Sequence, residues 1–125
     1  MSPQKLHVLV LDDEPLIALD MAQMLEDAGY EVVGPATTLA MAASLVASAP
    51  SLAAAVLDMR IDREWVWPLA ETIAAKGVPI VLVTGDQLTT MPPALAEAVR
   101  IDKPIPEQQL LDALAALVTR RSAPR

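Results

Sequence analysis

Acidic residues, one hydroxyl and one lysine directly follow apolar runs at four places in this sequence. They are the acids Asp12, Asp13 and Glu14, then Asp58, Thr84 and Lys103. Carboxylates that share one crevice repel one another, and each raises the pKa of the others unless a positive charge lies between them. A group of acids drawn from these positions would therefore suit a hard cation with oxygen ligands, such as Mg²⁺.

One carboxylate of such a group could also act as a nucleophile, and its attack on a phosphoryl donor would form an aspartyl phosphate. A cation and Lys103 would neutralise charge on the transferred group, while Thr84 donates a hydrogen bond to it. Each residue also has a simpler explanation, because Asp13 or Glu14 could cap a helix that begins at Pro15. Four such strand ends in one chain nevertheless favour a site over four unrelated caps.

Apolar runs of strand length alternate with helical patterns along the whole chain. The predicted strands cover residues 6–11, 31–34, 52–57, 79–83 and 99–102. The predicted helices cover residues 15–28, 38–49, 67–76, 87–97 and 107–120, and residues 59–64 are expected to form a loop. The apolar stripe expected for the first helix consists of Leu16, Leu19, Met21, Met24 and Leu25. Pro92 and Pro93 must lie at or near the start of the fourth helix, because proline disrupts a helix interior.

Five successive β-α units predict an α/β fold. We expect a flavodoxin-like, doubly wound, five-stranded parallel sheet with strand order 2-1-3-4-5 and helices on both faces. Residues 1–125 should form a single domain, with a core at about residues 5–119 and a short basic C-terminal tail. Ligands bind such sheets outside the carboxyl ends of the strands, where the winding direction reverses. That point lies between the first and third strands, where Asp12, Asp13 and Asp58 would converge.

The composition argues against several classes of function. The net charge is -7, and the nine Lys and Arg residues are scattered, which argues against nucleic acid as a partner. There is no cysteine and only one histidine, so thiolate catalysis and Cys- or His-rich metal sites are excluded. We find no signal peptide and no apolar stretch of roughly 20 residues that would span a membrane. A cytoplasmic location is therefore expected.

The sequence resembles the receiver domains of two-component response regulators over essentially its whole length. The family's first strand and acidic pair are similar to residues 8–17, VLVLDDEPLI. The strand that carries the phosphoacceptor resembles residues 53–59, AAAVLDM. The two remaining motifs are similar to IVLVTG at residues 80–85 and to IDKP at residues 101–104. Each motif is weak alone, but the combination is specific.

The resemblance implies that Asp58 is the phosphoacceptor and that a histidine kinase or a histidine phosphotransferase is the donor. It also implies a Mg²⁺ site, with Asp13 and Asp58 as direct ligands and Asp12 acting through a water molecule. Arg60 would bind the cation through its backbone carbonyl. The only enzymatic steps expected of such a domain are its own Mg²⁺-dependent phosphorylation and dephosphorylation.

The resemblance further implies that Lys103 pairs with the phosphoryl group and that Thr84 closes onto it. The Lys103–Pro104 bond is expected to be cis, although only about 5–6% of X-Pro bonds are. Such a domain acts through a downstream protein. It is expected to be a monomer, or a weak homodimer formed through the fourth helix, fifth strand and fifth helix.

Residues 67–85 also resemble single-domain receivers of the FAT GUY type, which implies a stand-alone regulator without an attached output domain. Two positions depart from the common receiver pattern. Arg100 stands where many receivers carry the aromatic residue of a switch, and Arg60 stands where a smaller polar residue is common. We expect the Arg60 side chain to change the lifetime of the phosphoryl group.

Two other functions stay open on the sequence. One is an interaction module that keeps the fold but works without phosphorylation. The other is a phosphatase-type hydrolase with an Asp nucleophile, although Arg60 occupies the place where such enzymes usually carry a second acid. Flavin binding is disfavoured, because the turn after the first strand offers acids where a phosphate needs free N–H groups.

Overall fold

Five parallel strands form the central sheet of this protein. The computed structural model describes residues 5–49, 51–85 and 90–122. The strands are β1 (His7–Leu11), β2 (Glu31–Ala36), β3 (Leu52–Asp58), β6 (Ile80–Thr84) and β7 (Val99–Asp102). Their spatial order is β2-β1-β3-β6-β7, with parallel pairing throughout. This is the predicted order 2-1-3-4-5, so the flavodoxin-like fold is confirmed.

Four α-helices connect or follow these strands. They are α1 (Pro15–Asp27), α2 (Leu39–Ser48), α3 (Trp67–Ala75) and α4 (Glu107–Ser122). The Thr38 hydroxyl accepts the Met41 N–H at 3.0 Å and so caps the start of α2. Gly29 and Gly77, with φ of 98° and 79°, follow the ends of α1 and α3, where a left-handed residue stops a helix. The helix α4 extends into the predicted basic tail, whose residues 123–125 lie outside the described residues.

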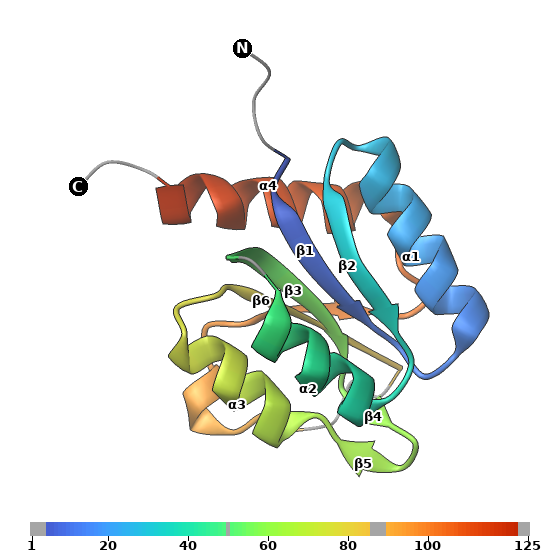
Figure 1. Ribbon diagram of the computed structural model, residues 1–125, viewed down its shortest axis with the longest axis vertical. Helices are drawn as coiled ribbons and strands as arrows, with labels where there is room; N and C mark the ends of the chain where they lie inside the picture. Colours follow the sequence, from blue (N-terminus) through green and yellow to red (C-terminus); the bar gives the residue numbers. More distant parts are fainter. Residues whose placement is uncertain (1–4, 50, 86–89, 123–125) are drawn as a thin grey trace.

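The side chains of the central strands alternate between two apolar layers, one on each face of the sheet. Leu9, Leu57 and Leu82 belong to the layer that packs against α2 and α3. The neighbouring valines Val10, Val56, Val81 and Val83 belong to the layer that packs against α1 and α4. Figure 1 shows the two pairs of helices on opposite sides of the sheet. Strands buried on both faces explain why their sequence is almost continuously apolar.

The buried face of α1 differs from the predicted stripe. Leu16 and Leu19 are 81% and 58% exposed. The buried residues of the helix are Ala18, Met21, Ala22 and Leu25. Their spacing of three and four residues keeps them on one side of the helix, whereas Leu16 lies on the opposite side. The prediction is confirmed for Met21, Met24 and Leu25, which pack in the layer shared with α4. It is wrong for Leu16 and Leu19, because the sheet accepts the small side chains of Ala18 and Ala22 in their place.

The predicted loop at residues 59–64 is also wrong, because this segment contains a β-hairpin. The strands β4 (Arg60–Ile61) and β5 (Glu64–Trp65) pair antiparallel. The Val66 N–H donates to the Met59 carbonyl at 2.8 Å and closes the base of the hairpin. We refer to residues 60–65 as the hairpin.

The predicted fourth helix at residues 87–97 is not observed in the described part of that segment. Residues 87–89 lie outside the description, and residues 90–97 contain only the 3-10 helix η1 (Pro93–Leu95). Pro92 and Pro93 lack the N–H donors that a longer helix needs. Leu95 is buried and packs against the α2 and α3 side of the sheet. The short η1 therefore takes this helix's place on the face predicted for a homodimer.

Two X-Pro peptide bonds are cis in the described part of the chain. The Lys103–Pro104 bond is cis, as predicted, and so is Gly34–Pro35. Among the residues that the structure describes, no helix combines the length and apolar character needed to cross a membrane.

Candidate functional site

The carboxyl ends of β1, β3, β6 and β7 bring all four predicted polar strand ends to one edge of the sheet. Asp12 and Asp13 directly follow β1, and Asp58 is the last residue of β3. The preceding residues Leu11 and Leu57 are paired across the two strands, so the acids emerge side by side. This edge is the point where the winding of the sheet reverses.

Asp58 lies deep in this edge, with only 7% of its surface exposed. Burial raises the pKa of Asp58 to about 6, and the neighbouring charge of Asp12 acts in the same direction. The Lys103 ammonium and the Arg60 N–H, which donates to Asp58 Oδ1 at 3.4 Å, partly oppose this rise. The carboxylate is thus poorly solvated and lies next to another acid.

Lys103 is the positive charge of the site. Its Nζ lies 3.1 Å from Asp12 Oδ2, 3.1 Å from Asp58 Oδ2 and 3.6 Å from Glu14 Oε1. Burial lowers the pKa of Lys103, but the two carboxylates of Asp12 and Asp58 outweigh burial, so the net shift is upward. Lys103 therefore remains an ammonium that bridges the two buried acids.

Thr84 lies at the same edge and is buried. It is the last residue of β6, one position beyond Val83, which pairs with Asp58. Its carbonyl accepts the Lys103 N–H at 2.8 Å, which extends the β6–β7 pairing by one residue. The parallel pairing of β3, β6 and β7 thus places Thr84 between the elements that carry Asp58 and Lys103.

Three carboxylates of this edge could hold a cation. Asp12, Asp13 and Asp58 each offer an oxygen within 4.8 Å of the others. Asp12 is fully buried, and among the described residues its Oδ2 is contacted by the Lys103 ammonium at 3.1 Å, which it shares with Asp58. Three clustered carboxylates, two of which share a single ammonium, form an all-oxygen donor set that fits a hard divalent cation such as Mg²⁺. The residues present therefore fit the group that the sequence predicted.

The hairpin approaches the same acids, and the contribution of Asp62 was missed from the sequence. The Asp62 N–H donates to Asp13 Oδ2 at 2.8 Å. The segment from Arg60 to Trp65 has three polar residues in a row and no strand-like alternation, so no local pattern indicated paired strands or the direction of the turn. The Arg60 guanidinium lies over the Trp65 ring, 4.7 Å from its centroid, and donates to the Arg63 carbonyl at 3.5 Å.

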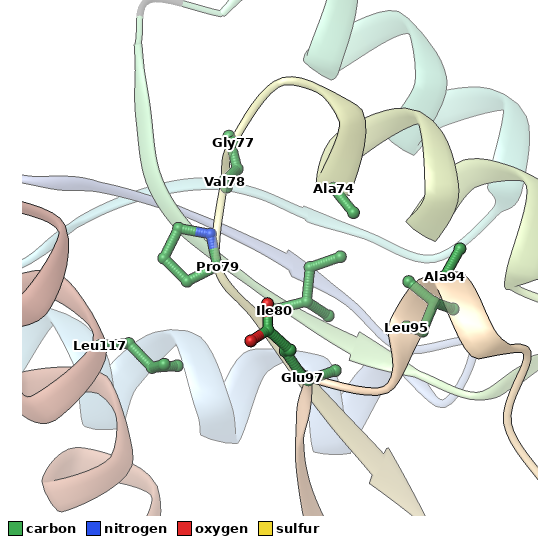
Figure 2. A pocket seen from close by; sticks show the side chains of 10 residues that line it. Ala74, Gly77, Val78, Pro79, Ile80, Ala94, Leu95, Glu97 and Leu117 are labelled. Carbon is green, nitrogen blue, oxygen red and sulfur yellow. The ribbon is translucent and has the colours of Figure 1, made fainter.

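A groove of about 430 Å³ lies at the other end of β6. Figure 2 shows its walls, which come from the end of α3, the start of β6, the η1 segment and Leu117 of α4. Val78, Pro79 and Ile80 line it at the amino end of the strand, whereas the acids gather at the carboxyl ends. None of the described residues that line the groove belongs to the charged site, so the two are separate.

Comparison with known proteins places this arrangement in a family. The response regulator receiver domain profile matches residues 8–115. A transcriptional regulatory protein, PdtaR from Mycobacterium tuberculosis, is 38% identical over 80 residues, which cover 62% of this chain and 38% of that protein. The chain thus spans about two fifths of the length of this curated relative.

Solved structures agree in fold. The solution structure of SdrG from Sphingomonas melonis Fr1 is 31% identical with a TM-score of 0.76, covering 94% of this chain and 99% of that one. The crystal structure of a response regulator receiver protein from Sinorhizobium medicae WSM419 is 25% identical with a TM-score of 0.81, covering 97% and 100%. The family profile matches most of the chain, and both solved structures share its fold. This protein therefore belongs to the response regulator receiver domain family.

Proposed function

We propose that this chain is a phosphoacceptor of two-component or phosphorelay signalling, in which Asp58 receives a phosphoryl group from a phosphohistidine. The single observation that carries the proposal is the bridge of Lys103 between Asp12 and Asp58 at 3.1 Å each. A buried nucleophile, a second acid and a fixed ammonium then lie within contact distance of one another. Phosphoryl transfer needs mainly such positioning and charge stabilisation.

In the proposed step, an Asp58 carboxylate oxygen attacks phosphorus and forms an O–P bond. The P–N bond to the donor imidazole breaks, and the imidazole leaves with the electron pair. Lys103 is close enough to Asp58 to neutralise charge on the transferred group. Thr84, at the end of the neighbouring strand, would donate its hydroxyl hydrogen to a phosphoryl oxygen.

A divalent cation would be held by Asp12, Asp13 and Asp58 together with the Arg60 carbonyl. When bound, Mg²⁺ would supply positive charge that offsets the repulsion between the carboxylates and the incoming phosphoryl oxygens. The raised pKa of Asp58 supports a need for such charge, because the nucleophile must be ionised in a buried place.

The donor is proposed to be a histidine kinase or a histidine phosphotransferase, acting in the cytoplasm. Leu16 and Leu19 are exposed on the first turns of α1, directly after the acids of the site. Exposed aliphatic side chains beside a polar site are a suitable contact for a protein that must bring its phosphohistidine to Asp58. The signal would then pass to a downstream protein, because an added phosphoryl group shifts a population of conformers through its charge and acceptor oxygens.

The test is phosphorylation with acetyl phosphate and Mg²⁺, followed by intact-protein and peptide mass spectrometry. We expect the mass of one phosphoryl group on the peptide that contains Asp58. Omission of Mg²⁺ and the Asp58→Asn variant should both remove the signal. The exposed acid Asp20 lies on α1, and Asp20→Asn serves as a matched control that retains it.

Two results would contradict the proposal. A protein that binds Mg²⁺ but gains no mass at Asp58 would be an interaction module that works without phosphorylation. Continuous turnover of a simple phosphomonoester that is lost in Asp58→Asn would identify a hydrolase instead.

A further inference from the structure

We propose that the hairpin of residues 60–65 is a positioning element for the cation site, and that the Asp62 backbone N–H holds the Asp13 carboxylate in place for the cation. This inference deepens the proposed function and rests on it. It concerns a backbone donor from outside the central sheet, which no strand-end motif in the sequence indicates.

The Asp62 N–H and the Asp13 carboxylate are in direct contact. The Asp62 N–H lies 2.8 Å from Asp13 Oδ2, in the short range typical of hydrogen bonds to a charged acceptor. The two residues are separated by 49 positions in the chain, so the bond depends on tertiary structure. An ionised carboxylate has about four acceptor positions on its two oxygens. With one position of Oδ2 occupied by Asp62, Oδ1 stays available for a cation.

The turn of the hairpin has an uncommon backbone conformation. Asp62 and Arg63 have φ of 50° and 71°, so both central residues of the turn are left-handed. Two left-handed residues form the tight turn that matches the twist of a two-residue hairpin. Asp tolerates this conformation, but Arg, with its long side chain, adopts it rarely. The turn is therefore maintained by its surroundings, and the contact with Asp13 is one of them.

The hairpin is anchored at both ends by packing. Met59, Ile61 and Val66 are buried in the apolar layer shared with α2 and α3. On the outer side, Arg60 lies over Trp65, whose ring stacks on Trp67 with centroids 5.4 Å apart and planes inclined by 5°. A turn held in this way can keep the position of its N–H.

The hairpin also contacts a second ligand. The Arg60 N–H donates to Asp58 Oδ1, and the Arg60 carbonyl is the proposed backbone ligand. One short element thus donates backbone hydrogen bonds to both Asp13 and Asp58. Groups that orient metal ligands typically change metal affinity by 10–100-fold when they are removed.

The experiment measures the Mg²⁺ dissociation constant by calorimetric titration of the full chain stripped of metal. Asp62→Pro removes the N–H donor and the left-handed conformation, and we expect Mg²⁺ binding to weaken by about tenfold. Asp62→Asn removes the side-chain charge but keeps the donor, and we expect less than about a threefold loss. Arg63→Gly suits the turn better and should leave the affinity at or above that of the original protein.

A second measurement does not depend on the folding of the proline variant. Amide hydrogen exchange at Asp62 should be slow in the original protein and clearly faster in Asp13→Ala, which removes the acceptor. The inference is overturned if Asp62→Pro binds Mg²⁺ as tightly as Asp62→Asn, or if Asp62 exchange is the same with and without the Asp13 carboxylate.

The two proposals fail in different ways. If the original protein binds Mg²⁺ and is phosphorylated on Asp58 but the hairpin variants change nothing, only the positioning inference is wrong. If the original protein neither binds Mg²⁺ nor accepts a phosphoryl group, the proposed function is wrong and the inference falls with it.

Discussion

Asp58 combines two requirements that oppose each other at the level of a single residue. Burial shields the carboxylate from water, as an aspartyl phosphate would need, but it also raises the pKa to about 6. Lys103 lowers it again through its contact with Asp58 Oδ2 at 3.1 Å. The ionised form is therefore maintained by one ammonium in a site with at least two nearby acids.

This opposition predicts how stability depends on pH. The folded protein retains the Asp58 proton up to pH about 6, whereas the unfolded carboxyl releases it near 3.8. Between these values the folded state binds more protons, so stability falls as pH rises. The Asp58→Asn variant has no carboxyl group at this position, so its stability does not fall in this pH range for this reason. Without metal it should be more stable than the original protein above pH 6, by on the order of 2 kcal/mol, and this gain should vanish below about pH 4.

Urea unfolding from pH 4 to pH 8 in a chelator measures this difference. The exposed variant Asp20→Asn is the matched control, and its stability should follow the original protein throughout. A constant difference between Asp58→Asn and the original protein at all pH values would show that Asp58 is not the titrating group.

At the scale of secondary-structure elements, two short segments, the hairpin and η1, pack at the sheet where the sequence predicted a loop and a helix. The hairpin places a backbone donor at the acidic edge, and η1 covers the sheet where a helix was expected. The orientation of α1 is a further example. Its buried face is built from Ala18, Met21, Ala22 and Leu25, which leaves Leu16 and Leu19 available for a partner.

The orientation of α1 can be tested by a pair of identical substitutions. Leu25 is fully buried, and Leu19 is 58% exposed on the same helix. We expect Leu25→Ala to lower the free energy of unfolding by about 3 kcal/mol, because it leaves a cavity in the core. Leu19→Ala should change it by no more than about 0.5 kcal/mol. Equal losses in chemical denaturation would mean that the helix packs with a different face.

At the scale of the whole molecule, the negative charge gathered at one edge of the sheet links metal binding to the stability of the fold. The chain carries a net charge of -7, and three of its carboxylates converge on one edge of the sheet. Any ligand that binds only the folded state raises stability in proportion to the logarithm of its concentration. A cation that enters this site would therefore stabilise the entire domain, since the site is assembled only when β1 and β3 are paired.

We expect Mg²⁺ to raise the thermal unfolding midpoint. At a concentration 100 times its dissociation constant it should add about 2.7 kcal/mol to the free energy of unfolding. Asp13→Asn should lose most of this gain. NaCl at matched ionic strength controls for general screening of the net charge. An equal response of Asp13→Asn and the original protein to Mg²⁺ would exclude Asp13 as a ligand.

The order of the strands and the polar edge of the sheet followed from the sequence alone. Apolar runs of strand length stop abruptly at Asp12, Asp58 and Lys103, and parallel strands must bring those ends to one side. The starts of α1 and α2 could also be predicted from the sequence, because Pro15 and Thr38 act on residues close to them in the chain. These features depend on local chemistry and on the handedness of β-α-β connections, which any sequence of this pattern shares.

Only the tertiary structure decided the hairpin, the face of α1 and the replacement of the fourth helix by η1. The hairpin is held by a contact between Asp62 and Asp13, which are 49 positions apart, so no local window of sequence contains both partners. The α1 face depends on which side chains the sheet accepts, and small alanines fit there in place of larger leucines. Pro92 and Pro93 disfavour a longer helix, so only the single turn of η1 forms. Leu95 covers the sheet from that turn.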